Sequence, residues 1–135
     1  MAWFAIDAPT LLHLVASGLR LNPAHQLVAP NVIRSHALAL MLDSVQRGEP
    51  TDVQALERHE RITEVKMRLL GDRTSRRTAW KLAREHGWDS IYAAEYIAIT
   101  KLQADQLVTV DPELTAMATG IVPLASFDHL VEGQA

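Results

Sequence analysis

Two aspartates directly follow short apolar runs, at positions where carboxylates could hold a metal ion. Asp7 follows residues 3–6, and Asp111 follows residues 107–110. Ligands of parallel α/β sheets gather at the carboxyl ends of the strands, so the two side chains are placed to converge. Carboxylate oxygens suit Mg²⁺ or Mn²⁺, which would orient a water and neutralise phosphate charge during hydrolysis. The alternative is that each aspartate simply caps a helix, as the pair Asp111-Pro112 suggests.

Strand-like and helix-like segments alternate along the chain. Apolar runs predict strands at residues 3–6, 107–110 and 121–124, with a further short one at 27–29. Helical spacing and capping residues predict helices over residues 9–18, 31–48, 51–70, 74–87, 89–102 and 111–120, and a short terminal helix beginning at Ser126. This alternation favours an α/β fold with a small, mostly parallel central sheet flanked by helices.

The composition is that of one compact domain spanning residues 1–135. Hydrophobic residues make up 48% of the chain and charged residues 21%, which is typical of a globular protein. The absence of cysteine excludes disulfides, thiolate zinc sites and thiol nucleophiles. No apolar run approaches the roughly 18 residues that a membrane helix requires, and the N-terminus has no basic leader. We therefore expect a cytoplasmic protein that does not associate with a membrane.

Four segments of the sequence resemble successive landmarks of PIN-domain proteins, and VapC-type ribonuclease toxins are the nearest. They are AIDAPTLLHL, LVAPNVIRSHALAL, YAAEYIAITKLQADQLVTVDPEL and GIVPLASFDHL. The resemblance implies a PIN-like three-layer domain and a metal-dependent endoribonuclease that cleaves RNA phosphodiester bonds. It also implies a toxin–antitoxin context, with a cognate antitoxin, RNA and a second copy of the chain as expected partners.

PIN ribonucleases assemble an acidic pocket from four positions, and two of these are acidic here. The resemblance assigns metal binding to Asp7 and Asp111, and a supporting catalytic role to Thr109. His36 and Ala93 stand at the other two positions, so the pocket is depleted. Since Mg²⁺ prefers oxygen ligands, His36 would serve as an auxiliary, by binding Mn²⁺ or Zn²⁺ or by positioning a water, unless it is a hydrogen-bonded core residue.

One nearby acid could compensate for Ala93. Asp89 lies one turn earlier and about 40° round the same helix, whereas Glu95 lies about 200° round. Asp89 would therefore face the site as a second auxiliary, although a helix cap is the alternative. Nucleophile elbows, Gly-rich phosphate loops and the His-Glu-x-x-His pattern are absent from the sequence.

Positive charge is concentrated in the middle of an otherwise acidic chain. The net charge is −3, yet seven of the 13 Lys and Arg residues lie between positions 66 and 84. The candidates for RNA or partner contact are Arg73, Arg76, Arg77, Lys81 and Arg84. A solvated face, a partner interface and an RNA contact all remain open for this stretch. We expect Trp80 and Trp88 to be core or interface anchors rather than base-stacking platforms.

Two functions follow from the sequence. The first is a metal-dependent endoribonuclease, impaired by its depleted pocket. The second is a non-catalytic PIN-fold module that binds RNA or an antitoxin.

Overall fold

A parallel β-sheet forms the centre of the protein in the computed structural model, which describes residues 2–131. Its strands follow the order β3-β2-β1-β4-β5, and every pairing is parallel. The strands are β1 (Ala2–Ile6), β2 (His25–Pro30), β3 (Arg68–Leu70), β4 (Gln106–Val108) and β5 (Leu124–Ala125). The first strand therefore lies in the middle of the sheet, with β4 beside it.

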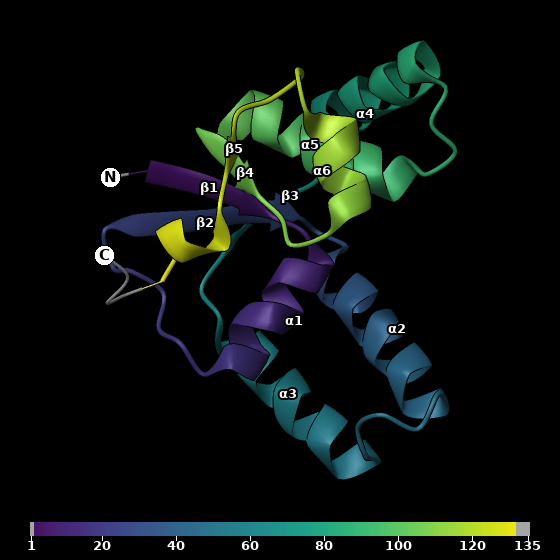
Figure 1. Ribbon diagram of the computed structural model, residues 1–135. Coiled ribbons are helices and arrows are strands. Elements are labelled where there is room, and N and C mark those ends of the chain that lie inside the picture. The colour runs from purple at the N-terminus through teal and green to yellow at the C-terminus, as the bar shows by residue number, and fades with distance from the viewer. Residues whose placement is uncertain (1, 132–135) are drawn as a thin grey trace.

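Within residues 2–131, six α-helices cover the two faces of the sheet (Figure 1). One group contains α1 (Ala8–Ser17), α2 (Ile33–Gln46) and α3 (Asp52–Glu64), which pack against one another below the sheet in this view. The other contains α4 (Arg73–His86), α5 (Ile91–Gln103) and α6 (Pro112–Ala118), and α5 packs on β1, β2 and α4. A short 3-10 helix, η1, spans Phe127–His129. The expected three-layer α/β arrangement is confirmed.

The core lies on both sides of the central strands. Ile6, Leu107 and Val108 are fully buried in the sheet, and Leu11 and Ile97 cover it from opposite layers. Strands enclosed on both faces consist of continuous apolar runs because they have no solvent side. This burial fixes the strand ends, from which the loops that carry the polar side chains depart.

The sequence-based prediction of one helix over residues 51–70 is wrong. Helix α3 ends at Glu64, and residues 68–70 form the edge strand β3, paired with β2. Val65 already has an extended backbone, with φ −69° and ψ 121°. Pairing of Leu69 with Ala29 of the neighbouring strand supplies backbone hydrogen bonds that local helical spacing cannot reveal.

Two helix starts also differ from the prediction. Asn31 does not cap α2, whose N-cap is Val32 without a side-chain hydrogen bond. Helix α4 is capped by Asp72 rather than by Thr74 or Ser75, since the Ser75 N–H donates to Asp72 Oδ1 at 2.8 Å and the Asp72 N–H donates to Ser75 Oγ. This reciprocal capping box moves the start of the basic helix ahead of both predicted caps.

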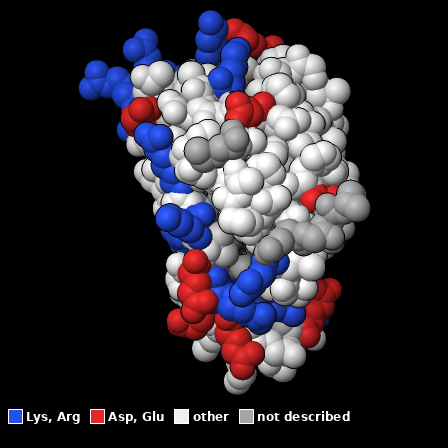
Figure 2. All heavy atoms as spheres, turned by 90° about the vertical axis from the view of Figure 1, so that its left-hand side faces the viewer, with Lys and Arg blue, Asp and Glu red and all other residues white. Residues whose placement is uncertain are grey.

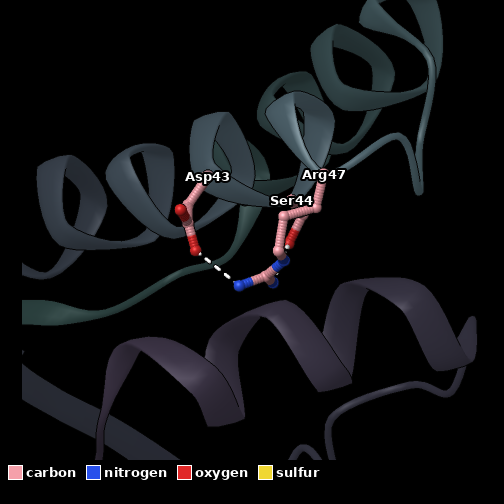
Figure 3. A network of polar contacts seen from close by, with 3 residues as sticks. All are labelled: Asp43, Ser44 and Arg47. Carbon is pink, nitrogen blue, oxygen red and sulfur yellow. Dashed lines mark hydrogen bonds and ion pairs between the residues drawn. The ribbon is translucent and has the colours of Figure 1, made fainter.

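The exposed end of α2 carries a local ion pair (Figure 3). Arg47 Nη1 lies 2.7 Å from Asp43 Oδ2, and Arg47 Nη2 donates to Ser44 Oγ at 3.4 Å. Such exposed i,i+4 pairs contribute only about 0.3–0.5 kcal/mol. No helix within residues 2–131 is long and apolar enough to cross a membrane.

Candidate functional site

Asp7 stands at the carboxyl end of β1 and is the N-cap of α1. The register pairs Ile6 with Val108, so Asp7 lies beside Thr109, the first residue after β4. The Asp7 side chain is only 1% exposed. The parallel sheet therefore aligns the two segments that the sequence predicted would converge.

Two threonines bind the Asp7 carboxylate and connect it to the loop that follows β4. Thr109 donates its hydroxyl to Asp7 Oδ2 at 2.7 Å, and the Thr10 hydroxyl donates to Asp7 Oδ1. Each hydroxyl oxygen also accepts a backbone N–H from that loop. Val110 donates to Thr10 Oγ1 at 3.1 Å, and Asp111 donates to Thr109 Oγ1 at 3.0 Å. Asp7 thus holds the loop that carries the second aspartate.

Asp111 is the N-cap of α6. Its Oδ1 accepts the Glu113 N–H at 3.0 Å, and its backbone oxygen accepts the Thr115 hydroxyl at 2.9 Å. Within residues 2–131 we find no hydrogen-bond partner for Asp111 Oδ2. Both aspartates therefore cap helices, as the alternative interpretation held, but the Oδ2 atom of Asp111 remains available to a ligand.

Two tyrosines of α5 hold His36. His36 Nδ1 lies 2.9 Å from the Tyr96 hydroxyl, and the imidazole is stacked with the rings of Tyr92 and Tyr96 at centroid distances of 5.7 and 5.9 Å. Tyr96 is buried, while Tyr92 is 52% exposed. The hydrogen bond through Nδ1 leaves Nε2 as the ring nitrogen available to another group.

A cleft of about 490 Å³ brings the predicted site residues together. Asp7, Asp111, His36, Asp89 and Ala93 all contribute to its lining. Thr109 is not in the lining, and acts through its bonds to Asp7 and Asp111. The sequence-based reasoning missed three further lining residues with titratable side chains: Tyr92, Tyr96 and Glu113. The i,i+4 spacing of the two tyrosines placed them on one helix face, and this was the available signal.

The electrostatics of the cleft are acidic. Its lining contains Asp7, Asp89, Asp111 and Glu113 but no Lys or Arg. Burial raises the pKa of Asp7 above its ordinary value, and the hydrogen bonds from Thr10 and Thr109 oppose this shift. Burial also raises the pKa of Tyr96, and the charge of Asp7 adds to the effect. The cleft therefore attracts cations, and it would repel a phosphodiester unless a cation lay between them.

The carboxylates of Asp7 and Asp111 are of the chemical kind that Mg²⁺ and Mn²⁺ bind. Mg²⁺ is commonly bound by one or two carboxylates and retains several waters, and Asp7 with Asp111 supply that minimum. Among the described residues, no group of three or more acidic, histidine or cysteine side chains is placed to hold a metal. The protein ligands would thus be fewer than in an all-protein cage.

The basic stretch forms the exposed face of α4. Figure 2 shows Lys and Arg side chains projecting from the upper part of the molecule, at the height of α4 in Figure 1. Arg73, Arg76, Arg77 and Lys81 line a shallow hollow of about 570 Å³ together with Thr78 and Trp80. Trp80 is 65% exposed, so of the two expected places the core is excluded and the interface stays a prediction. Trp88 is half-buried, lies against the core and stacks on His86.

Comparison with solved structures identifies a similar fold. The crystal structure of PAE2754 from Pyrobaculum aerophilum matches with a TM-score of 0.69 and 18% sequence identity, over 94% of this chain and 92% of that one. No family model matches the chain, and no curated protein matches it by sequence. The likeness supports the fold alone, and the chain has a PIN-like α/β fold with a five-stranded parallel sheet.

Proposed function

We propose that this protein is a metal-dependent endoribonuclease of the PIN type that works with a reduced set of acidic ligands. The observation that carries the proposal is the shared cleft of Asp7 and Asp111, connected through Thr109. Such a pair of strand-end carboxylates suits phosphodiester hydrolysis because it can hold a cation against the phosphate. The reduced number of ligands predicts weak cleavage.

Each residue has a defined part in that reaction. Asp7 and Asp111 would hold Mg²⁺ or Mn²⁺, which when bound neutralises phosphate charge and activates a water. Thr109 orients both aspartates, through the Asp7 carboxylate and the Asp111 N–H. His36, held through Nδ1, presents Nε2 to position a water or to accept a proton, and Asp89 adds negative charge at the rim.

The second candidate is a non-catalytic PIN-fold module that binds RNA or an antitoxin. It is favoured by His36, which is engaged with Tyr96, and by Ala93, whose side chain has no ligand atom. A protein partner is further supported by an apolar hollow of about 510 Å³ between α2 and α3. Exposed Leu38, Leu42 and Leu56 line this hollow, and a second copy of the chain or an antitoxin helix would cover them.

Asp111→Asn tests the enzyme most cleanly. Because asparagine caps helices about as well as aspartate, the variant should fold with nearly unchanged stability while losing a charged ligand. Calorimetry with Mg²⁺ and Mn²⁺, together with RNA cleavage, should show a loss of metal binding and of activity. Asp128→Asn, an equal charge change on the exposed surface, should leave both intact. Equal cleavage by both variants would reject the proposed site.

Restoring the two missing acidic residues tests whether their absence limits metal binding and RNA cleavage. The double variant His36→Glu with Ala93→Asp adds two carboxylates to the cleft lining, so metal affinity should rise. Stability without metal should fall because clustered anions repel, and Mg²⁺ should restore it by binding the folded state alone. A folded variant that binds metal and leaves RNA intact would favour the non-catalytic module.

A further inference from the structure

The exposed face of α4 is a row of cations with one tryptophan among them. At about 100° per residue, Arg73, Arg77, Trp80, Lys81 and Arg84 fall within about 100° of arc, and Trp80 lies at one edge of it. Arg76 extends the arc by about 40°. The buried residues of α4 are Ser75, Ala79, Leu82 and Ala83. We call the exposed arc the α4 ridge.

Little on the protein neutralises this charge. Lys81 Nζ lies 3.9 Å from Glu85 Oε1, and both side chains are more than half exposed. Arg76 Nη1 donates to the Gly71 carbonyl at 3.2 Å. Within the described part of the chain, Arg73, Arg77 and Arg84 have neither an ion-pair partner nor a hydrogen bond from the side chain. The guanidinium donors of Arg73, Arg77 and Arg84 are therefore free for an anionic ligand.

The exposed Trp80 indicates which class of anionic ligand fits the α4 ridge. The indole is 65% exposed beside Arg76, Arg77 and Lys81 in the hollow of about 570 Å³. A purely anionic ligand would make no use of a large flat apolar ring, whereas a nucleobase stacks on one and brings a phosphate with each nucleotide. Figure 2 shows Lys and Arg side chains projecting from the upper part of the molecule, at the height of α4 in Figure 1, and such exposed cations can contact phosphates.

We propose that the α4 ridge binds single-stranded RNA, with a base stacked on Trp80 and phosphates bound by the surrounding arginines and Lys81. Duplex RNA keeps its bases stacked inside, so it cannot offer a free base face to the indole. The ridge also leads toward the acidic cleft, because Gly87 and Trp88, directly after α4, line that cleft. The inference rests on the proposed function for the choice of RNA, and it adds a binding surface outside the cleft, with Trp80 as the stacking platform.

The test is RNA binding measured without cleavage. Fluorescence anisotropy of a labelled single-stranded RNA of about 12 nucleotides is recorded in a chelating buffer at about 50 mM salt. Trp80→Ala should weaken binding about 5- to 100-fold, and Trp80→Phe should retain most of it because the ring remains. Arg73→Glu with Arg77→Glu should weaken binding at least about tenfold. It should also reduce the slope of log affinity against log salt concentration by about 1.4, because two phosphate contacts are lost. Arg20→Glu with Arg61→Glu, exposed and outside α4, is the charge-matched control and should bind nearly as the original protein does.

The controls separate stacking from charge. Inorganic polyphosphate has no bases, so Trp80→Ala should leave its binding unchanged while the ridge arginine variant weakens it. Circular dichroism verifies that each variant keeps its helices. Unchanged RNA binding by Trp80→Ala, equal affinity for duplex RNA, or equal losses in the ridge and control variants would each overturn the inference. Because the chelator removes metal, these outcomes are independent of the Asp111→Asn cleavage test.

Discussion

Replacing Thr109 by valine should reveal how strongly the two aspartates are connected. Valine has nearly the same shape as threonine but has no hydroxyl. The variant would remove the donor to Asp7 Oδ2 at 2.7 Å and the acceptor for the Asp111 N–H at 3.0 Å. The Asp7 carboxylate is buried and would lose one of its two hydroxyl partners. The loop between β4 and α6 would lose one of its two links to α1.

The magnitude follows from these two contacts. A hydrogen bond to a charged group contributes about 1.5–3 kcal/mol, and a backbone N–H left without a partner costs about 1–3 kcal/mol. Both contacts are partly buried, so we take the lower part of each range and expect a loss of about 2–4 kcal/mol in the free energy of unfolding. For a chain of this length, that loss corresponds to a fall in melting temperature of about 7–14 °C.

Urea unfolding followed by tryptophan fluorescence measures this loss, and two variants calibrate it. Thr109→Ser keeps the hydroxyl and should lose less than about 1 kcal/mol. Thr100→Val makes the same change at a threonine that is fully buried, and within residues 2–131 its hydroxyl bonds only the Tyr96 carbonyl one turn earlier, so this variant should also cost little. If Thr109→Val is within about 0.5 kcal/mol of the original protein, the connection through Thr109 does not stabilise the site.

Three further predictions concern other parts of the molecule. Burial raises the pKa of Glu95 above its ordinary value of 4.5, despite the nearby charge of Arg76. The ionised carboxylate therefore lowers the free energy of unfolding at pH values above the folded-state pKa, and this destabilisation is absent well below pH 4.5. Glu95→Gln should therefore be more stable than the original at pH 7, with the gain vanishing on acidification; equal urea midpoints at pH 7 would contradict this. Tyr96→Phe removes the partner of His36 Nδ1 and should cost about 1–3 kcal/mol in urea unfolding, and no loss would mean that the hydroxyl bond is unimportant. Ile62→Ala should lower the free energy of unfolding by about 2–5 kcal/mol because this side chain is fully buried. A smaller loss measured by calorimetry would contradict this prediction.

The sequence was informative where a signal was local. The apolar runs before Asp7 and Asp111 predicted strands β1 and β4, and parallel pairing of those strands placed both aspartates in one cleft. The start of α5, expected at residue 89, was predictable to within one or two residues: the N-cap is Ser90 rather than Asp89, and the Ser90 hydroxyl accepts the Ala93 N–H. In each case the deciding interaction lies within a few residues or follows from a general rule of sheet topology.

Long-range contacts explain what the sequence did not reveal. His36 and Tyr96 are 60 residues apart, and only the packed fold shows their hydrogen bond. Strand β3 is three residues long and begins with an exposed arginine, so it lacks the apolar run that identified the other strands. Trp80 was expected to be a core or interface anchor, but the buried face of α4 consists of Ser75, Ala79, Leu82 and Ala83, so Trp80 lies outside the core.

Asp7 has structural roles that do not depend on catalysis. Asp7 caps α1 through the Thr10 N–H and orders the loop after β4 through two threonines, and a protein without any catalytic activity would need both interactions. Its presence therefore does not discriminate between the enzyme and the non-catalytic module. Asp111 is more informative, because asparagine could supply its cap equally well while a metal ion would require the charge. The chemistry of the cleft thus depends on whether Asp111 Oδ2 has a ligand, rather than on how well Asp7 is held.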